Sequence, residues 1–493
     1  MRSSWCRSWP VLLLLAVGSG AGAAQAGTTV ADTVRATVIG NPQIDEVRND
    51  RLAVDQELAQ ARALQYPSVD LRITAGPSYT RYRDRRPPFD EDSFNEAQGL
   101  AILSQRLYDG GATQSEIQRQ LARVDSAARR VTEAAELIGL DGVQAHLETL
   151  RSQEIVELAR RNLRRQETLL DQVRRLAEGG AVGESDLRQA ETRTAAARTT
   201  LEQTLGALED ARATYQEVVG RPPEDLMRDA PPNGALPAGI EAAAELASTQ
   251  SPTVLIAAAD VDAAEAELEA SRSGYYPRLD LEVRGLANTN TGDIESERYE
   301  ASAQLVMRYN LFRGGGDIAR EREAFHRVNV ARAALVKNRR RAEQDARSYW
   351  NALQTATNRV RSLRQQVEAS RRTRDLYLQE FQIGRRSLLD LLDSDAELFQ
   401  TEVTLVTAGY TRDFAVYRLL ATVGRMLAAL GVTPPPESVD RHRTAERDQT
   451  PERVTAKSRP RLDLRAKPRP LRGADRGEPE IEGRFRAGPD GGG

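Results

Sequence analysis

The sequence is poor in the residues that build metal sites, disulfide frameworks and aromatic enzyme cores. Its 493 residues include one cysteine and three histidines, and only 5% are aromatic. So few sulfur and imidazole ligands leave little from which to build a metal site. We find no clustered nucleophile, general base or metal ligands, and therefore expect no enzyme activity, no catalytic residue and no cofactor.

The sequence also lacks a strong net charge and an apolar composition. Lys+Arg number 69 against 72 Asp+Glu, which gives a net charge of -3 and predicts no nucleic-acid partner. A mean hydropathy of -0.54 excludes a bundle of membrane-spanning helices. The 29% of charged residues, with abundant Ala, Leu, Arg and Glu, predict long polar-faced helices packed through small residues, as in coiled coils.

The first 26 residues have the features of a secretory signal peptide. Arg2 and Arg7 precede the apolar run Val11–Val17, and the small-residue site Ala24-Gln25-Ala26 follows. Seven apolar residues are too few to span a bilayer as a helix. We expect cleavage after Ala26 and export of a chain that has lost Cys6; a retained membrane anchor is the alternative.

The body of the chain is a tandem repeat. Asn41-Pro42 recurs 210 positions later as Ser251-Pro252, and Tyr66-Pro67-x-x-Asp70-Leu71 recurs at the same offset. Leu107-Tyr108-x-Gly-Gly recurs 204 positions later as Leu311-Phe312-x-Gly-Gly. The six-residue difference falls around residues 85–90, where a surface hairpin loop would tolerate an insertion. Matches that keep one offset before this insertion and one offset after it indicate an internal duplication.

Each repeat contains two segments with the period of a β-strand. After Pro67, three apolar residues alternate with three polar ones, and the same alternation follows Pro277. Such segments fit a half-buried sheet, or a membrane barrel with lipid outside and water inside. An ordinary soluble hairpin is the alternative. Four strands cannot close a barrel alone, so the membrane version requires several chains.

Two proline-free stretches, 111–177 and 316–383, predict long helices of roughly 100 Å each. Their apolar positions are spaced alternately by four and three residues, which is the pattern of a left-handed coiled-coil seam. Gly139 and Gly142 lie inside the first helix, and the sequence offers no reason for them. Shorter helices are expected at 42–65 and 240–273 and after each turn. We expect end-to-end stacking of 186–218 with 240–273, and of 390–430 with 42–65, because each pair matches one long helix in length.

These patterns divide the chain into four parts. Residues 1–26 are the predicted signal peptide, and 434–493 are a predicted disordered tail rich in Pro, Gly and charge. The first structural repeat, 27–239, comprises strands at about 68–108, a long helix at about 111–177, a half-length helix at about 186–218 and a waist linker at 220–239. The second, 240–433, comprises strands at about 278–312, a long helix at about 316–383 and a half-length helix at about 390–430.

The order, spacing and duplication of these motifs resemble those of TolC-type outer-membrane efflux proteins, the outer-membrane factors of tripartite export systems. The resemblance covers residues 40–432 and includes two turn motifs, Gly180-x-x-Gly183-x-x-Asp186 and Gly384-x-x-x-x-x-Asp390. It implies a mainly helical fold with a small β part. In that fold, long coiled-coil-like helices form an α-barrel, and four strands per chain contribute to a trimeric 12-stranded outer-membrane β-barrel.

The same resemblance implies a function and partners. The chain would be the exit duct of a tripartite efflux or type I secretion system, lying in outer-membrane lipid with its helices in the periplasm. It would act as a homotrimer with a periplasmic adaptor (membrane fusion) protein and an inner-membrane pump. The exported substrate, the class of pump and the role of the tail stay open. A periplasmic coiled-coil scaffold or adaptor without a membrane barrel is the alternative.

The candidate site is the turn that precedes Asp390 and Asp393. These residues are separated by three positions and can project from one helix face. The resemblance implies that the pair faces the lumen near a closed tip, where three copies would form a carboxylate ring that favours cations. The alternative is that Ser387-x-x-Asp390 is a helix capping box, with Ser185 or Asp186 capping the other helix.

The turn glycines complete the candidate site. We expect Gly180, Gly183 and Gly384 to adopt left-handed conformations. The resemblance implies that an adaptor docks beside them and beside Asp186. Arg385 and Arg386 either tie the tip to neighbouring carboxylates or are simply solvated. His146 is expected on a helix surface.

Overall fold

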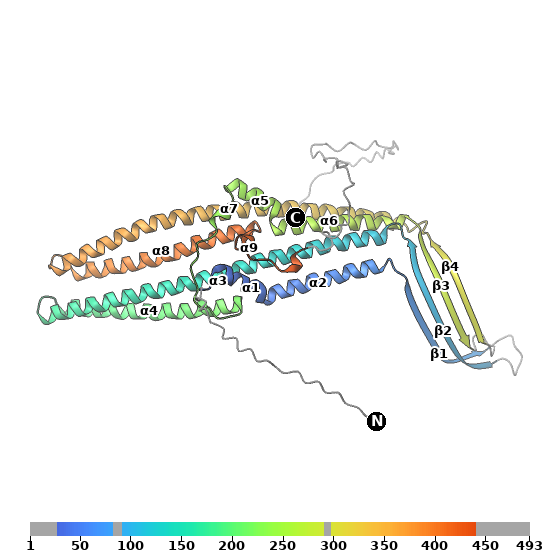
Figure 1. Cartoon of the computed structure of the whole chain (residues 1–493), viewed down its shortest axis with the longest axis horizontal. Coiled ribbons are helices and arrows are strands. Elements are labelled where there is room, and N and C mark those ends of the chain that lie inside the picture. The colour runs from blue at the N-terminus through green and yellow to red at the C-terminus, as the bar shows by residue number, and fades with distance from the viewer. Residues whose placement is uncertain (1–26, 82–90, 290–296, 440–493) are drawn as a thin grey trace, which may run out of the picture. The chain divides into compact units, whose positions relative to one another are not determined.

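Figure 1 shows the computed structural model of the chain, which describes residues 27–81, 91–289 and 297–439. The predicted signal peptide, the insertion around residues 85–90 and the tail beyond residue 439 lie outside these residues. The described part of the chain is mostly helical with four strands. The longer helices are α2 Pro42–Ala63, α3 Ala112–Glu178, α4 Glu184–Val219, α6 Pro252–Arg272, α7 Gly316–Gln382 and α8 Leu388–Thr422. The short helices are α1 Val30–Gly40, α5 Ile240–Gln250 and α9 Met426–Ala429, with single 3-10 turns η1 Asn233–Ala235, η2 Ser273–Tyr275 and η3 Pro436–Ser438. The strands are β1 Ser68–Arg81, β2 Glu91–Tyr108, β3 Arg278–Thr289 and β4 Glu297–Arg308.

The helices α3 and α7 run without interruption, as the absence of proline predicts. Each has 67 residues, which corresponds to about 100 Å. Each begins after a glycine in the left-handed conformation, with φ of 89° at Gly111 and 81° at Gly315. The predicted seams are buried at Val156, Ala159 and Val173 of α3 and at Leu353, Val360 and Val367 of α7. The prediction of long coiled-coil-like helices is confirmed.

The half-length helices lie along the long ones in pairs that differ from the prediction. Figure 1 shows α4 in line with α2 along one side of α3, and α8 in line with α6, both packed between α3 and α7. The expected stacking of 186–218 with 240–273, and of 390–430 with 42–65, is therefore wrong. Helix lengths alone cannot decide which helices share a neighbour, because that depends on tertiary contacts.

Two segments that were each predicted as one helix are divided in the structure, because the prediction compared helix lengths and did not consider the residue at each break. The segment 240–273 is two helices, because Pro252 starts α6 at its first position and Ser251 lies between α5 and α6. In the first repeat Asn41-Pro42 separates α1 from α2 in the same way. The segment 390–430 is also divided, because Gly424 has a φ of 69° between α8 and α9.

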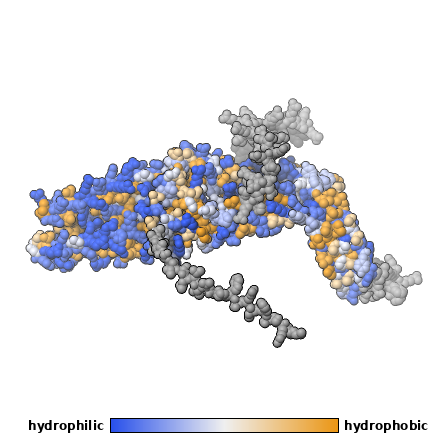
Figure 2. All heavy atoms as spheres, viewed as in Figure 1, coloured by the Kyte–Doolittle hydropathy of each residue, from blue (hydrophilic) through white to orange (hydrophobic). Residues whose placement is uncertain are grey.

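The four strands form one antiparallel sheet in the order β1-β2-β3-β4. The register pairs Leu71 with Ala101, Leu103 with Val283, and Leu281 with Leu305, so apolar side chains from all four strands share one face. None of the described segments covers that face: Leu71 of β1 is 70% exposed and Leu305 of β4 is 62% exposed. Figure 2 shows hydrophobic side chains gathered over the strands, whereas the surface of the long helices is mainly hydrophilic.

The opposite face of the sheet carries a cross-strand ladder of ion pairs. Arg308 of β4 donates to Asp280 at 2.7 Å and to Glu282 at 2.8 Å, both on β3. Arg278 and Arg284 of β3 pair with the same two carboxylates. One face of the sheet is therefore apolar and the other is charged, which is the pattern that the strand period predicts.

The middle of the helical region explains the two glycines inside α3. A Cβ atom on Gly139 would lie 3.1 Å from the Met426 side chain, and one on Gly142 would lie 2.6 Å from Thr37 Oγ1. These glycines allow α1 and α9 to approach α3 closely. Glu136, 3% exposed, then accepts hydrogen bonds from the backbone N–H groups of Met426 at 3.2 Å and Leu427 at 3.4 Å.

His146 is buried rather than exposed, so the expectation of a surface histidine is wrong. Its Nε2 donates to the Met227 carbonyl oxygen at 2.9 Å, which leaves Nδ1 to accept from Thr33 Oγ1 at 2.7 Å. Tyr215 OH lies 3.2 Å from the same Thr33 oxygen. This chain of hydrogen bonds joins α1, α3, α4 and the linker after α4. Burial lowers the pKa of His146, so the neutral ring is favoured.

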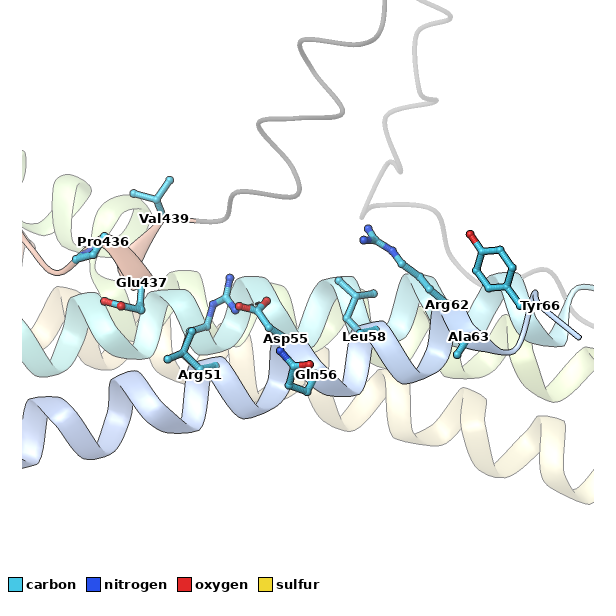
Figure 3. A pocket seen from close by; sticks show the side chains of 12 residues that line it. Arg51, Asp55, Gln56, Leu58, Arg62, Ala63, Tyr66, Pro436, Glu437 and Val439 are labelled. Carbon is cyan, nitrogen blue, oxygen red and sulfur yellow. Dashed lines mark ion pairs between the residues drawn. The ribbon is translucent and has the colours of Figure 1, made fainter. Parts of the chain in front are cut away.

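The C-terminal end of the described chain packs against α2 and α3, although the sequence predicted a disordered tail from residue 434. Arg48 of α2 donates from Nε to Glu437 at 2.9 Å and from Nη2 at 3.2 Å, a forked contact that holds η3 in place. A cavity of about 620 Å³ lies beside this segment. Figure 3 shows Arg51 and Asp55 of α2 pointing toward each other on its wall, near Glu437 and Val439.

Candidate functional site at the paired helical turns

The turns that join α3 to α4 and α7 to α8 have the same backbone geometry. Gly180 and Gly384 have φ values of 74° and 72°. In each turn the residue after the glycine donates to a helix carbonyl five positions earlier, Ala181 to Leu176 at 2.8 Å and Arg385 to Glu380 at 2.8 Å. This is the Schellman arrangement, in which a left-handed glycine ends a helix.

Gly183 does not share that conformation, so the prediction of a left-handed Gly183 is wrong. Its φ of -79° and ψ of 160° are extended, because it is the N-cap residue of α4. No side-chain hydrogen bond caps that helix, so the alternative in which Ser185 or Asp186 caps it is also wrong. Asp186 lies in the first turn of α4, where its negative charge is favoured by the helix dipole.

An apolar cluster joins the two turns. It combines side chains from both helical hairpins: Leu169, Val173, Ala190, Phe381, Leu388, Leu391 and Leu392. Leu391 and Leu392 are each 1% exposed. The α3–α4 and α7–α8 hairpins are therefore held together at their turns by buried leucines, and the start of α8 cannot move without disturbing α3.

Asp390 and Asp393 both lie in the first two turns of α8, and each has an arginine nearby. Ser387 is the N-cap of α8, and its Oγ accepts from the Asp390 backbone N–H at 3.2 Å. The Asp390 side chain is 45% exposed, with Oδ2 3.7 Å from Arg386 Nη1. The Asp393 side chain is 61% exposed, and its Oδ1 accepts from Arg193 Nη2 of α4 at 2.8 Å. Ser387 capping is thus present, and Asp393 links the two hairpins.

The two turn arginines differ in their surroundings. Arg386 lies over the Tyr377 ring at 3.9 Å from the ring centroid, and its Nε is 3.2 Å from Glu380 Oε2. It therefore folds back onto the last turns of α7. Arg385 is exposed and forms no ion pair with any residue in the described ranges.

A second set of charges, which sequence reasoning did not single out, lies one to three helical turns further from the α7–α8 turn. Asp395 of α8 is buried and accepts from Arg374 Nε of α7 at 2.9 Å. Glu402 of α8 accepts from Arg371 of α7 at 2.8 Å. One sequence signal could have pointed to Asp395. It follows Asp393 by two positions, so on a helix the two carboxylates lie on different faces.

A third set joins the linker after α4 to both hairpins. The Arg228 guanidinium lies 4.0 Å from the Tyr410 ring centroid, and Nη2 donates to Asp413 at 2.8 Å. Its Nη1 is 3.6 Å from Glu154 of α3. A Cβ atom on Gly409 would lie 3.1 Å from Arg228 Nη2, so glycine at this position makes room for the arginine.

Among the residues that the structure describes, no helix carries an apolar stretch long enough to cross a bilayer. The same part of the chain contains no group of His, Cys, Asp and Glu side chains placed to hold a metal ion.

Comparison with known proteins gives the family. A family model described as outer membrane efflux protein matches residues 34–221 and 243–425. The chain is 24% identical to outer membrane efflux protein BepC of Brucella suis, over 80% of this chain and 85% of that one. It is 24% identical to alkaline protease secretion protein AprF of Pseudomonas aeruginosa, over 75% of this chain and 79% of that one.

Solved structures share the fold at lower sequence identity. The CmeC outer membrane channel of Campylobacter jejuni superimposes with a TM-score of 0.69 at 14% identity, over 80% of this chain and 86% of that one. The outer membrane protein VceC of Vibrio cholerae gives 0.67 at 14% identity, over 82% and 97%. The family match spans both repeats and both turns described above, and the chain belongs to the outer membrane efflux protein family.

Proposed function

We propose that this chain is the outer-membrane exit channel of an efflux or type I secretion system and that it works as a homotrimer. The observation that carries the proposal is the sheet, in which the described residues leave one apolar face bare and the edges of β1 and β4 unpaired. In lipid, an open sheet edge would leave backbone N–H and C=O groups without hydrogen bonds. Edge strands from neighbouring copies would satisfy each other, and three copies would supply an even number of strands.

The two faces of the sheet support this arrangement. Val69, Leu71 and Ile73 of β1 and Leu305 and Met307 of β4 would face acyl chains. The opposite face, with Asp280, Glu282 and Arg308, would line a water-filled lumen. A periplasmic scaffold without a membrane sheet would instead require something to cover the apolar face.

The helices also leave two edges for neighbouring copies. Helix α7 packs mainly against α5, α6 and α8, and α2 and α4 pack mainly against α3. On α7, Phe325, Val330 and Leu376 are exposed apolar residues, as is Leu52 on α2. Packing of α7 against the α2–α4 edge of the next copy would bury them. The 67-residue helices would then extend the channel by about 100 Å.

We propose the paired turns as the periplasmic entrance. Asp390 and Asp393 of three chains would surround the opening and favour cations there. The ion pairs with Arg386 and Arg193 reduce the free charge of each carboxylate, so the ring is a weaker cation site than six unpaired carboxylates would be. Gly180, Gly183, Asp186, Gly384, Arg385 and Arg386 form the surface where we expect a periplasmic adaptor to dock.

Energy for transport would come from an inner-membrane pump. The names of the matched relatives cover both export classes, since BepC is an efflux protein and AprF is a protease secretion protein. Small toxic compounds and secreted proteins are therefore both candidate cargoes.

The test is fractionation of cells that produce the full chain, followed by electrophoresis of detergent extracts with and without heating. We expect the protein in outer membranes, as a species of three times the chain mass that dissociates on heating. Recovery as a soluble periplasmic monomer would refute the proposal.

A further inference from the structure

Arginine side chains surround a cavity where α3, α7 and α8 meet. Its volume is about 450 Å³. The charged side chains on its wall are Arg161, Arg164, Arg165, Arg374 and Asp395. The wall of the cavity therefore carries four guanidinium groups and one carboxylate, that of Asp395.

That carboxylate is already engaged. The Asp395 side chain is 2% exposed, and its Oδ1 accepts from Arg374 Nε at 2.9 Å. Arg374 Nη1 also pairs with Asp375 at 2.9 Å. Arg374 is thus neutralised by its neighbours, and Arg161 and Arg164 of α3, with Arg165 only loosely paired, provide the excess positive charge.

The α3 arginines lack hydrogen-bonded acid partners. Arg165 Nε lies 4.0 Å from Asp395 and Nη2 lies 3.9 Å from Glu402, and both nitrogens are buried without a hydrogen bond. Arg161 and Arg164 are exposed at the mouth of the cavity and form no ion pair with any residue that the structure describes, so the buried donors belong to Arg165. A buried donor without a partner is unfavourable, and like charges placed together repel. An anion would relieve both costs.

We propose that this cavity binds a carboxylate-bearing ligand through Arg161, Arg164 and Arg165. The planar fork of a guanidinium matches a carboxylate with two parallel hydrogen bonds, so three guanidiniums suit a ligand with two or more carboxylates. Leu169, Leu378 and Leu391 on the same wall provide apolar contact for its carbon skeleton. The carboxylates arrive either on a free polycarboxylic acid or on an acidic protein segment. This site is separate from the channel assignment and does not depend on it.

The test is titration calorimetry on the purified full-length protein in detergent at low ionic strength, with citrate and hexaglutamate as probes. The site variant is Arg161→Gln/Arg164→Gln. The matched control is Arg174→Gln, because Arg174 is an exposed arginine of α3 that does not line the cavity. Each guanidinium–carboxylate contact corresponds to roughly a tenfold change in affinity, so we expect binding about 100-fold weaker in the site variant and within about twofold of the parent in the control.

The outcomes separate the sources and decide the proposal. Binding of citrate supports a free acid as the ligand, and binding of hexaglutamate alone supports an acidic protein segment. Arg164→Lys, which keeps the charge, is expected to bind about tenfold more weakly through loss of the forked contact. The proposal is overturned if neither probe binds, if the site and lysine variants both bind like the parent, or if Arg174→Gln weakens binding as much as the site variant.

Discussion

The buried carboxyl of Glu136 makes the packing of α9 on α3 depend on pH. Burial raises the pKa of Glu136 to about 8 from 4.5, opposed in part by the hydrogen bonds from the Leu427 and Met426 backbone N–H groups. Because the folded-state pKa is raised, the folded protein holds a proton that the unfolded chain releases between those two values. The resulting stability is fully present below pH 4.5 and is lost as the pH rises through about 8. A shift of this size, at 1.36 kcal/mol per unit, corresponds to about 5 kcal/mol.

Glu136→Gln removes this titration while keeping the shape of the side chain. We expect amide hydrogen exchange in residues 423–432 of the parent to show protection that falls between about pH 4.5 and about pH 8 and is level above that, after correction for the intrinsic exchange rate. The glutamine variant should show no such fall, because its amide does not ionise. Equal pH dependence in the two proteins would refute the reasoning, since another group would then control the local stability.

Three further predictions concern packing and the turns. Gly142→Ala should lower the free energy of unfolding by about 1 to 3 kcal/mol through overpacking against Thr37, measured by thermal melting. The control is Gly206→Ala, where a Cβ atom meets nothing within 4 Å, and it should leave the stability unchanged or raised. Equal effects of the two substitutions would contradict the close approach of α1. Arg193→Ala should free Asp393 and strengthen divalent-cation block of single-channel current, and unchanged block would remove Asp393 from the entrance proposal. Leu391→Ala should cost about 2 to 5 kcal/mol locally and accelerate proteolysis at the α7–α8 turn, and a parental cleavage rate would argue against the apolar cluster.

The secondary structure was largely predictable because both repeats carry the same sequence signals at matching positions. Proline-free stretches gave α3 and α7, and alternation after Pro67 and Pro277 gave strands in the right places. The short helix α1 was overlooked and α5 was merged with α6, although Asn41-Pro42 and Ser251-Pro252 mark where these helices end. Which half-length helices share a long neighbour was not predictable, because no local signal encodes contacts between distant segments.

The site was predictable in position but not in its contacts. The glycine spacing located both turns, yet it could not distinguish the left-handed Gly180 from the extended Gly183. The pair Arg193–Asp393 joins residues 200 positions apart and depends on the apolar cluster that aligns the hairpins. The reason for Gly139 likewise appears only when α9, from the other end of the chain, packs against it.

Cysteine cross-linking of the edge strands tests the closure of the sheet most directly. In one chain, β2 and β3 separate β1 from β4, which places the two edges about 14 Å apart, beyond the reach of a disulfide. Cys6 is the only native cysteine, so replacing it with serine gives a clean background. Leu71→Cys is combined in turn with cysteine at Ala301, Ala303, Leu305 and Met307, which samples the unknown register between copies. The account predicts that oxidation yields covalent dimers and trimers for at least one pair in outer membranes; monomers alone for every pair would contradict it.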